Sequence, residues 1–356
     1  MSNKQRTIAI NTGGGDCPGL NAVIRSIVKR GRIHLNWKII GIEDSFNGLL
    51  EDKMRIMDLT RSSIAGALTR GGTILGTTNR GNPFDVNGVD RSDRIVERLN
   101  ELGCEGLIAL GGDGSMAICH QLAEKFGLKV IGVPKTIDND LKGTDETFGF
   151  NSAVEFATLA VDRLHSTAES HDRIMVLEVM GRDAGFIALH AGVAGGADAI
   201  LIPEIPFDLD IVAKTVMDRQ AMGRHFSIVV VAEGAYPKGG GRVEDGKGGV
   251  AGHLGGVGRY VSEKLSELTG IDSRETVLGH LQRGGIPTAY DRILASRLGN
   301  HAVDLVEAGR WGRMVVMENH KVSSIPMVEA IGGTRNVAPE SDLVATARNV
   351  GITFGD

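Results

Sequence analysis

Short apolar runs alternate along this chain with longer segments in which apolar residues recur every three or four positions. The short runs predict buried strands at Thr7–Ile10, Trp37–Ile42, Leu107–Leu110, Val130–Val133, Ile174–Val179, Ala199–Ile202 and Ile228–Ala232. The longer segments predict helices at Asn21–Arg30, Ser115–Phe126, 151 to about 168, from about 183, and Leu209–Arg224. Such alternation is typical of parallel sheets covered by helices on both faces. There are more strands than one such sheet comfortably holds. We therefore predict an α/β protein with two doubly wound α/β domains, whose mainly parallel sheets face a shared cleft.

Composition and charge narrow the class of protein. The chain has 356 residues, 42% of them hydrophobic, and a net charge of −5. This balance provides no general field for nucleic acid or an anionic membrane. The three cysteines, Cys17, Cys104 and Cys119, have no CxxC spacing, which argues against a disulfide framework or a zinc site. No signal-peptide pattern or membrane-spanning apolar run occurs, so we predict a cytoplasmic protein with neither nucleic-acid nor membrane partners.

Glycine is the compositional outlier. The chain has 50 glycines, which cluster after apolar runs, where they allow the backbone to approach another group closely. Between Gly239 and Gly258, 10 of 20 residues are glycine. This Gly-rich insertion is predicted to be a loop or hairpin at a domain edge, which we favour over a lid.

Motifs for several common nucleotide sites are missing. There is no GxxxxGK[ST] loop and no HRD or DFG motif, so P-loop and protein-kinase sites are excluded at the motif level. Gly112-x-Gly114-x-x-Ala117 follows a predicted strand and resembles a dinucleotide fingerprint. A cation, Lys135, stands where that fingerprint needs an acid for the ribose, so a dehydrogenase is disfavoured.

Two neighbouring strands end in residues suited to phosphoryl transfer. The first is followed by GGDGS at Gly111–Ser115 and the second by PKTIDND, which ends at Asp140. Ligands of α/β sheets bind beyond the carboxyl ends of the strands. Asp113 suits Mg²⁺, although a helix N-cap is the alternative. Asp138 or Asp140 suits a base for an alcohol, although an Asx-rich turn is the alternative.

Basic residues form a third group. Arg173 precedes a predicted strand and Arg182 follows it, so about 25–30 Å separates them. Either they serve different purposes, or two subunits contribute to one pocket. Arg274, His280 and Arg283 lie around another strand end, and arginine forks suit a sugar phosphate.

Seven segments in order make the pattern specific. They are NTGGGDCPGLNAVIR, RGGTILGT, IALGGDGS, PKTIDNDLKGTDETFGF, SHDRIMVLEVMGRDAG, VLGHLQRGG and YDRILASRLG. Together they closely resemble the phosphofructokinase family, over nearly the whole chain from Thr7 to about Gly309. This family phosphorylates fructose 6-phosphate at its 1-hydroxyl to fructose 1,6-bisphosphate in glycolysis.

The resemblance implies a role for each matching residue. Asp138 matches the base and Asp113 the magnesium ligand, while Thr136 and Asp140 flank the reacting hydroxyl and Arg182 completes the catalytic group. The implied sugar-phosphate residues are Thr136, Ile137, Asp138, Met180, Gly181, Arg182, Glu233, His280, Leu281, Gln282 and Arg283, with Arg173 and Arg274 lent by a neighbouring subunit. The implied donor residues are Gly14, Gly15, Arg80, Gly111, Gly112, Asp113, Gly114 and Ser115.

The resemblance also implies the organisation of the molecule. A larger donor-binding domain would comprise residues 1–140 and about 287–335. A smaller sugar-phosphate-binding domain would comprise about 141–286 and 336–356, with the insertion at 239–258. A homodimer or homotetramer with shared active sites is expected.

The phosphate donor depends on two positions. Lys135 resembles the diphosphate-using members of the family, whereas Gly114 resembles the ATP-using members, which also have an arginine where this chain has Asn79 and a displaced Arg80. A carboxylate at position 114 would crowd the α-phosphate of a nucleotide, so we weigh Gly114 more and predict Mg-ATP, with diphosphate as the alternative. A non-catalytic subunit and a GGDG-type NAD or lipid kinase are remote alternatives. Asp138 and Asp113 are retained, and such kinases lack PKTIDND and the arginine set.

Overall fold

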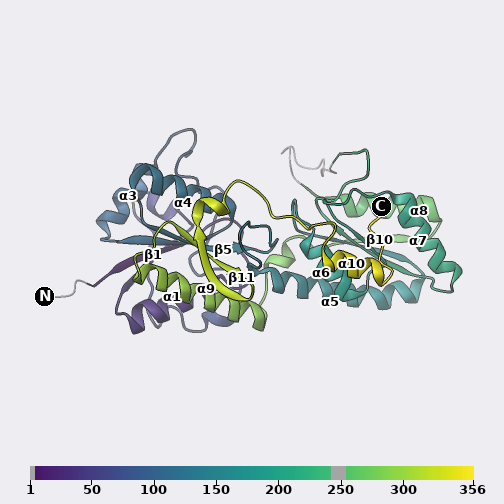
Figure 1. Cartoon of the computed structure of the whole chain (residues 1–356), viewed down its shortest axis with the longest axis horizontal. Helices are drawn as coiled ribbons and strands as arrows, with labels where there is room; N and C mark the ends of the chain where they lie inside the picture. The colour runs from purple at the N-terminus through teal and green to yellow at the C-terminus, as the bar shows by residue number, and fades with distance from the viewer. Residues whose placement is uncertain (1–4, 242–253) are drawn as a thin grey trace. The chain divides into compact units, whose positions relative to one another are not determined.

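The computed structural model describes residues 5–241 and 254–356, which form two compact units (Figure 1). Unit 1 comprises Met1–Ser152 and Arg283–Gly333, and unit 2 comprises Ala153–Gln282 and Thr334–Asp356. The chain first leaves unit 1 at Ser152, after the predicted end at residue 140. Residues 242–253 of the predicted Gly-rich insertion lie outside the described residues.

Unit 1 is built on a mainly parallel sheet with strand order β12-β11-β5-β4-β1-β2-β3, with β6 beside β5. Its strands are β1 (Thr7–Thr12), β2 (Lys38–Ile42), β3 (Ile56–Asp58), β4 (Gly106–Gly111), β5 (Val130–Thr136), β6 (Phe148–Gly149), β11 (Arg313–Glu318) and β12 (Lys321–Pro326). Among the strands of this sheet in the described residues, β3 and β12, at the two edges, are the ones that pair antiparallel. Because β5, β4 and β1 are adjacent and parallel, their carboxyl ends lie at one edge of the sheet.

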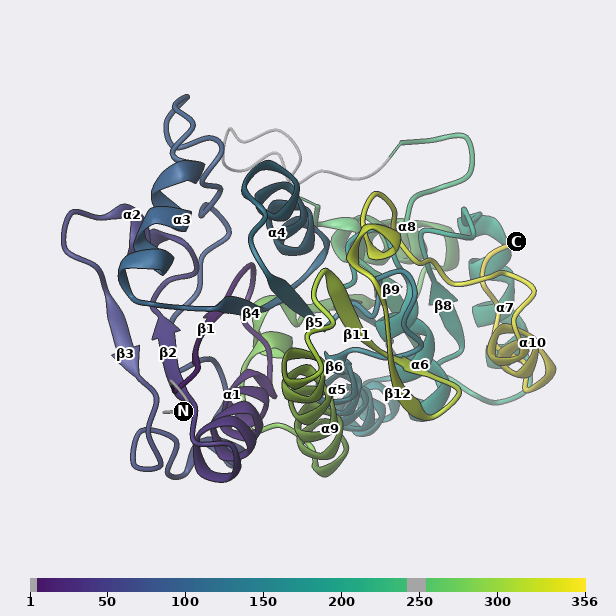
Figure 2. The same ribbon diagram turned by 60° about the vertical axis from the view of Figure 1, so that its left-hand side comes forward.

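Helices cover both faces of this sheet (Figure 2). One face carries α1 (Leu20–Val28) and α9 (Ala289–Glu307), and the other carries α3 (Ser92–Glu101) and α4 (Asp113–Phe126). The short α2 (Asn47–Leu50) lies beside α3. The helix predicted over Asn21–Arg30 is α-helical only to Val28 and continues as a π-helical turn over Lys29–His34, so that boundary was wrong.

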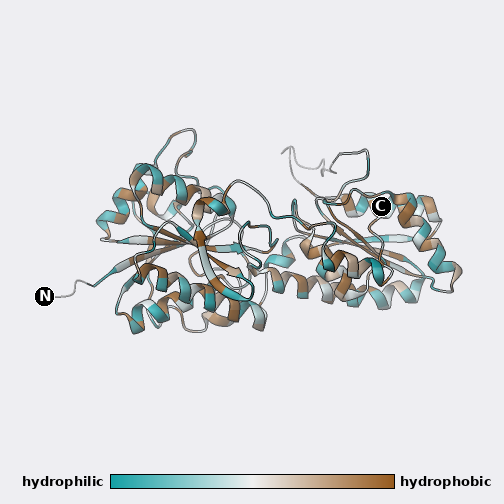
Figure 3. Cartoon of the chain, in the orientation of Figure 1, coloured by the Kyte–Doolittle hydropathy of each residue, from teal (hydrophilic) through white to brown (hydrophobic). Residues whose placement is uncertain are grey.

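The central strands are mostly hydrophobic rather than alternating (Figure 3). Every residue of β4 and β5 is buried, because helices remove both faces from water. Packing at β5 is tight: a Cβ on Gly132 would lie 2.4 Å from the sulfur of Met116. The fully buried β5 includes Lys135 and Thr136, which are polar and must therefore find partners inside the protein.

Unit 2 has a four-stranded parallel sheet with the order β10-β7-β9-β8. Its strands are β7 (Ile174–Val179), β8 (Ala199–Leu201), β9 (Ser227–Ala232) and β10 (Ser273–Val277). Its helices are α5 (Phe150–His171), α6 (Phe186–Gly195), α7 (Leu209–Ala221), α8 (Val257–Thr269) and α10 (Asp342–Asn349). Residues of α7 and α8 form one core with β7, β8 and β9, and α6 packs on the same strands with α10 beside it. The helix predicted over Leu209–Arg224 ends at Ala221. Both units are therefore α/β layers with mainly parallel sheets, as predicted.

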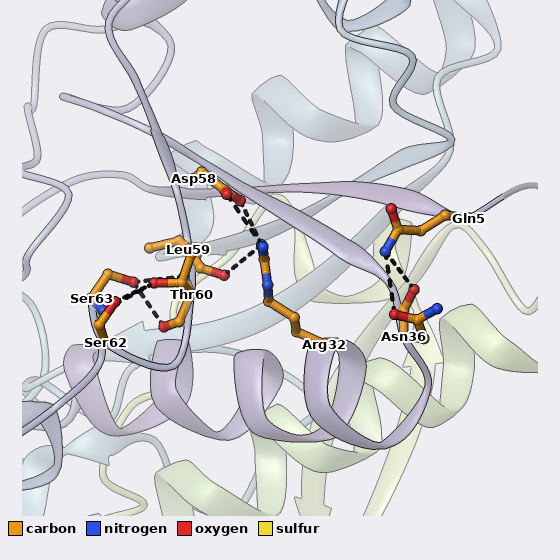
Figure 4. A network of polar contacts seen from close by, with 8 residues as sticks. All are labelled: Gln5, Arg32, Asn36, Asp58, Leu59, Thr60, Ser62 and Ser63. Carbon is orange, nitrogen blue, oxygen red and sulfur yellow. Dashed lines mark hydrogen bonds and ion pairs between the residues drawn. The ribbon is translucent and has the colours of Figure 1, made fainter.

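Polar contacts join segments of unit 1 on the side of its sheet where β1 and β2 begin (Figure 4). Arg32 in the π-helical turn donates to Asp58 Oδ1 at 2.5 Å and to the Leu59 carbonyl at 3.2 Å. Gln5 Nε2 donates to the Asn36 carbonyl at 2.9 Å. These bonds fix the segments around β1, β2 and β3 on the side away from the strands' glycine-rich ends. Within the described residues, no helix combines the length and apolar character needed to cross a membrane.

We expect Gly71→Ala to destabilise unit 1. A Cβ there would lie 2.1 Å from the carbonyl oxygen of Gly285, and a backbone atom cannot move aside cheaply. The expected loss is about 1–3 kcal/mol of unfolding free energy, the usual cost of overpacking. Thermal unfolding followed by circular dichroism measures it. Gly241→Ala is the matched control, since its Cβ would meet no atom within 4 Å. Equal melting temperatures for the two variants would show that the contact with Gly285 is unimportant.

Candidate active site

Two glycine-rich loops lie against each other in unit 1. The Gly13–Asp16 loop follows β1, and the Gly111–Ser115 segment links β4 to α4. The amide of Gly13 donates to the carbonyl of Leu110 at 2.9 Å. A Cβ on Gly13 would lie 2.7 Å from the hydroxyl of Ser115, so glycine is needed for the two loops to meet this closely.

Three side chains hold successive carbonyl groups of the Gly13–Asp16 loop. Thr77 Oγ1 donates to the Gly14 carbonyl at 2.6 Å, and Lys135 Nζ donates to the Gly15 carbonyl at 2.5 Å. Arg283 Nη1 donates to the Asp16 carbonyl at 3.2 Å. The N–H and C=O of a trans peptide point in opposite directions, so the amides that follow these carbonyls point away from the three side chains. Such an array of backbone amides suits a phosphate.

Lys135 is committed to this loop. Its side chain is 4% exposed, and its ammonium group lies against the Gly15 carbonyl. Burial lowers the pKa of Lys135, and the nearby guanidinium of Arg283 lowers it further, whereas Asp16 and Asp138 act in the opposite direction. The sequence suggested a cation directed at a donor phosphate, but in the structure Lys135 binds the backbone that surrounds that phosphate site.

The first turn of α4 is open. Asp113 is its first residue and is exposed, and a Cβ on Gly114 would have no atom within 4 Å. In the part of the chain that the structure describes, no three His, Cys, Asp or Glu side chains are grouped as metal ligands. One exposed carboxylate beside a phosphate site nonetheless fits Mg²⁺, which keeps several waters and takes one or two protein carboxylates together with substrate phosphates.

The base candidates lie on the loop that joins β5 to β6. Asp138 is 3% exposed, and its amide donates to Thr136 Oγ1 at 3.0 Å. Asn139 adopts a positive φ of 55°, and its Oδ1 accepts from the amide of Thr147 at 3.0 Å. The turn therefore depends on Asn139. It does not account for the two aspartates on either side of it, Asp138 and Asp140. Asp140 is less buried than Asp138.

Unit 2 holds the predicted MGRD loop in a constrained conformation. Gly181 has a φ of 147°, and Arg182 has a φ of 51°, which is uncommon for a residue with a side chain. Glu233 Oε1 accepts from the Arg182 amide at 3.0 Å, and a Cβ on Gly234 would lie 1.9 Å from the Arg182 carbonyl. Met180, which precedes the loop, is buried. The contact with Glu233 thus fixes the backbone of Arg182 while its side chain stays exposed.

The HLQR segment forms a 3₁₀ turn over Gly279–Arg283. His280 and Leu281 are exposed, whereas Gln282 is buried and donates to the Gly279 carbonyl at 3.2 Å. Arg283 belongs to unit 1 and holds the Gly13–Asp16 loop, as described above. Ile137 is fully buried on the base loop.

The remaining arginines lie elsewhere. Arg173 directly precedes β7 and bonds Asp272 Oδ2 at 2.7 Å, while Arg274 on β10 pairs with Asp272 Oδ1. This pair lies toward the amino ends of β7 and β10, and Arg182 follows the carboxyl end of β7, so the structure does not bring them together within one sheet. Arg80 is exposed, and Asn79 rather than Arg80 faces the Gly13–Asp16 loop, with its Oδ1 4.0 Å from a Cβ on Gly14.

Comparison with known proteins now decides the family. The model of the family described as "Phosphofructokinase" matches residues 7–306. The chain belongs to the phosphofructokinase family. It is 52% identical over 361 residues to a protein of Chloroflexus aggregans named ATP-dependent 6-phosphofructokinase, covering 100% of this chain and 99% of that protein.

Solved structures of phosphofructokinases share the fold. The Pichia pastoris phosphofructokinase in the T-state has a TM-score of 0.83 and 30% identity over 98% of this chain, which spans 37% of that longer chain. A pyrophosphate-dependent phosphofructokinase of Marinobacter aquaeolei has a TM-score of 0.80 at 23% identity, covering 95% of this chain and 87% of that one. The second likeness concerns the fold alone, so the phosphofructokinase fold does not decide the donor.

Sequence reasoning missed several residues that shape this phosphofructokinase site. Thr77 was part of RGGTILGT but received no role, and it holds the Gly14 carbonyl. Asn139 and Asp272 were also missed. The available signals were an asparagine between two aspartates, where a positive φ is tolerated, and an aspartate two residues before Arg274.

Proposed function

We propose that this chain is a 6-phosphofructokinase, which transfers the terminal phosphoryl group of Mg-ATP to the 1-hydroxyl of fructose 6-phosphate in glycolysis. The observation that carries the proposal is the placement of Asp138, a buried carboxylate at the end of β5, in the same unit as two glycine-rich loops with ordered backbone. The name of the relative from Chloroflexus aggregans supports the same activity. The product is fructose 1,6-bisphosphate.

The donor phosphates would lie against the two glycine-rich loops of unit 1. The amides of Gly15 and Asp16 and the N-terminus of α4 offer N–H groups to their oxygens. Asp113 would hold Mg²⁺, which neutralises phosphate charge when bound. The side chains at this place are absent or small, which leaves room for the phosphates. The residues concerned are Gly14, Gly15, Gly111, Gly112 and Ser115.

Asp138 is the proposed base. A carboxylate that touches the 1-hydroxyl accepts its proton as the new bond to phosphorus forms, and proximity to the hydroxyl matters more than basicity. The hydroxyl of Thr136 is bonded to the Asp138 amide and so fixes the start of the loop. Thr136 and Asp140 would flank the reacting hydroxyl.

Residues of unit 2 are proposed to bind the sugar phosphate. Arg182 presents an exposed guanidinium from a backbone fixed by Glu233, and His280 presents an exposed ring. These groups suit a phosphate and the hydroxyls of a sugar. We infer a donor-binding role for unit 1 and a sugar-binding role for unit 2.

ATP is favoured over diphosphate on two grounds. The open space beside Gly114 accommodates the α-phosphate and nucleoside. Lys135, the feature shared with diphosphate-using members, is occupied by the Gly15 carbonyl, so its presence does not argue for diphosphate.

A homo-oligomer with shared sites is proposed because Arg173 and Arg274 lie at the other end of the unit 2 strands from Arg182. Ile286, Tyr290 and Ile293 are exposed on or just before α9, and burying them against a second copy would be favourable. Homodimer and homotetramer both fit this proposal. The cytoplasmic location predicted from the sequence stays a prediction.

Asp138→Asn should lower kcat about 10²–10⁴-fold, because the amide cannot accept the hydroxyl proton. The change in KM should be smaller, since the side chain keeps its shape. A coupled assay of fructose 1,6-bisphosphate formation with ATP measures both constants. Asp140→Asn is the matched control and should lose less. Near-full turnover by Asp138→Asn would remove Asp138 from the role of base.

Gly114→Asp should lower kcat/KM for ATP by roughly ten- to a hundredfold, because a second carboxylate beside Asp113 repels and crowds the α-phosphate. Diphosphate activity should fall less. Assays with each donor on the unmodified protein come first, and a higher kcat/KM with diphosphate would overturn the choice of ATP.

Lys135→Met tests whether Lys135 supports the Gly13–Asp16 loop or binds a phosphate of the donor. As a support for the loop, it should impair both donors to a similar extent, and Thr77→Val should do the same because it frees the adjacent carbonyl. A loss confined to diphosphate in Lys135→Met alone would instead make Lys135 a phosphate ligand.

Mixing two inactive variants tests the shared site. Asp138→Asn chains and Arg173→Ala/Arg274→Ala chains, unfolded and refolded together, should regain part of the activity, since some hybrid pockets contain all the native groups. Each variant refolded alone is the control. Hybrids that form, as shown by native mass spectrometry, and remain inactive would exclude a pocket shared in this way.

A further inference from the structure

A carboxylate with no exposed surface lies at the start of α9. Asp291 is 0% exposed, and its Oδ2 accepts from the amide of Ser152 at 2.8 Å and from the Ser152 hydroxyl at 2.6 Å. Its Oδ1 is buried without a hydrogen-bond partner among the described residues, and no ion pair in that part of the chain includes Asp291. The hydrogen bonds that this carboxylate receives therefore come from Ser152, in the first turn of α5.

The arrangement is a helix-capping motif distributed over two helices. Thr288 is the N-cap of α9, and its hydroxyl accepts from the Asp291 amide at 3.2 Å. In an ordinary capping box the acid at this position bonds back to the amide of the N-cap residue. Here the Thr288 amide donates to the Ser152 hydroxyl at 3.0 Å, and that hydroxyl donates to Asp291. The carboxylate of Asp291 therefore bonds to Ser152 in the first turn of α5 instead of to the N-cap residue of its own helix.

Burial and hydrogen bonding act in opposite directions on the Asp291 carboxyl. Burial raises the pKa of Asp291, and the hydrogen bonds from Ser152 and Gly149 lower it. A buried carboxylate is unfavourable unless such donors compensate, and removing it leaves the donors without partners. The interaction is therefore directional: it fixes where Ser152 lies, in a way that apolar packing does not.

The junction held by Asp291 also closes the base loop. Gly149 of β6 pairs with Thr136 of β5, and Thr147 Oγ1 donates to the Thr136 carbonyl at 2.8 Å. Residues 137–147, which include Asp138, therefore span from β5 to a strand that runs directly into α5. The first turn of α5, which Asp291 holds at Ser152, is thus continuous in sequence with β6, which pairs with β5 and ends the base loop.

We propose that Asp291 is a positioning residue for the phosphoryl transfer: it anchors the junction of β6 and α5 and so fixes the loop that carries Asp138. The effect on the reaction rests on the proposed function of this chain. The anchoring of the loop does not, so the two are measured separately.

Four variants separate positioning from stability. Asp291→Asn and Ser152→Ala weaken the anchor, and Ser152→Thr restores the hydroxyl. Ser26→Ala removes a buried hydroxyl that donates to the Ser296 carbonyl at 2.7 Å between α1 and α9, away from the base loop, and serves as the matched control. Ser152→Ala keeps the experiment decisive if Asp291→Asn does not fold.

We expect Asp291→Asn to lower kcat about ten- to a hundredfold, the scale of a base displaced by a fraction of an ångström to an ångström, with KM for both substrates within about threefold. Ser152→Ala should show a smaller loss, and Ser152→Thr should recover most of it. Ser26→Ala should leave kcat unchanged even where its melting temperature falls as much.

Hydrogen exchange provides a readout that does not depend on turnover. Peptides covering residues 137–149 should exchange faster in Asp291→Asn and Ser152→Ala, while peptides from β4 keep their protection. Unchanged exchange in the base loop, or a kcat that follows melting temperature equally in all variants, would overturn the proposal. An inactive unmodified protein contradicts the proposed function instead, and exchange still decides whether Asp291 anchors the loop.

Discussion

Parallel pairing of β1, β4 and β5 is the constraint on which the candidate site depends. Parallel strands joined by right-handed helical crossovers all end at the same edge of the sheet, so three loops that are far apart in sequence become neighbours there. The loops after these strands carry the glycines, Asp113 and Asp138. Helices on both faces exclude water from the strands, which favours apolar residues there, and the polar residues lie at the strand ends. The candidate functional residues gather at one edge because of the same burial of apolar residues that forms the core.

Several charged side chains inside this structure hold backbone groups at the ends of elements. Lys135 bonds the Gly15 carbonyl and Asp291 bonds the start of α5. Glu178 on β7 likewise accepts from the amide of Gly258 at 2.7 Å, at the start of α8, and burial raises the pKa of that carboxyl. Each charge satisfies main-chain groups at the end of an element, where no regular ladder can satisfy them. Loops held in this way are prepared for a ligand before the ligand arrives, which reduces the entropy lost on binding.

The choice between ATP and diphosphate as the phosphate donor shows that the type of a residue does not by itself give its role. Lysine at position 135 is the same chemical group whether it binds a phosphate or a carbonyl, and a motif cannot distinguish the two. The surrounding structure can, because the ammonium group is buried against Gly15. The role proposed for Gly114, by contrast, depends on the absence of a side chain, and the open space beside it is visible only in three dimensions.

The order of apolar runs and helical segments was enough to predict two α/β layers, and the family motifs were enough to single out Asp113, Asp138 and Arg182. These are local properties: period, length and turn chemistry depend on neighbouring residues. Edge strands such as β3 and β12 were not predicted, because short antiparallel pairs at an edge are only partly buried and leave a weak pattern. Nor were the partners of Lys135 and Asp291, which lie 120 and 139 residues away along the chain. Sequence determined the family and which residues are candidates for the chemistry, since residue type sets charge and shape. Tertiary structure alone decided what each polar group binds, because a buried donor or acceptor takes whichever partner the fold brings within hydrogen-bonding distance.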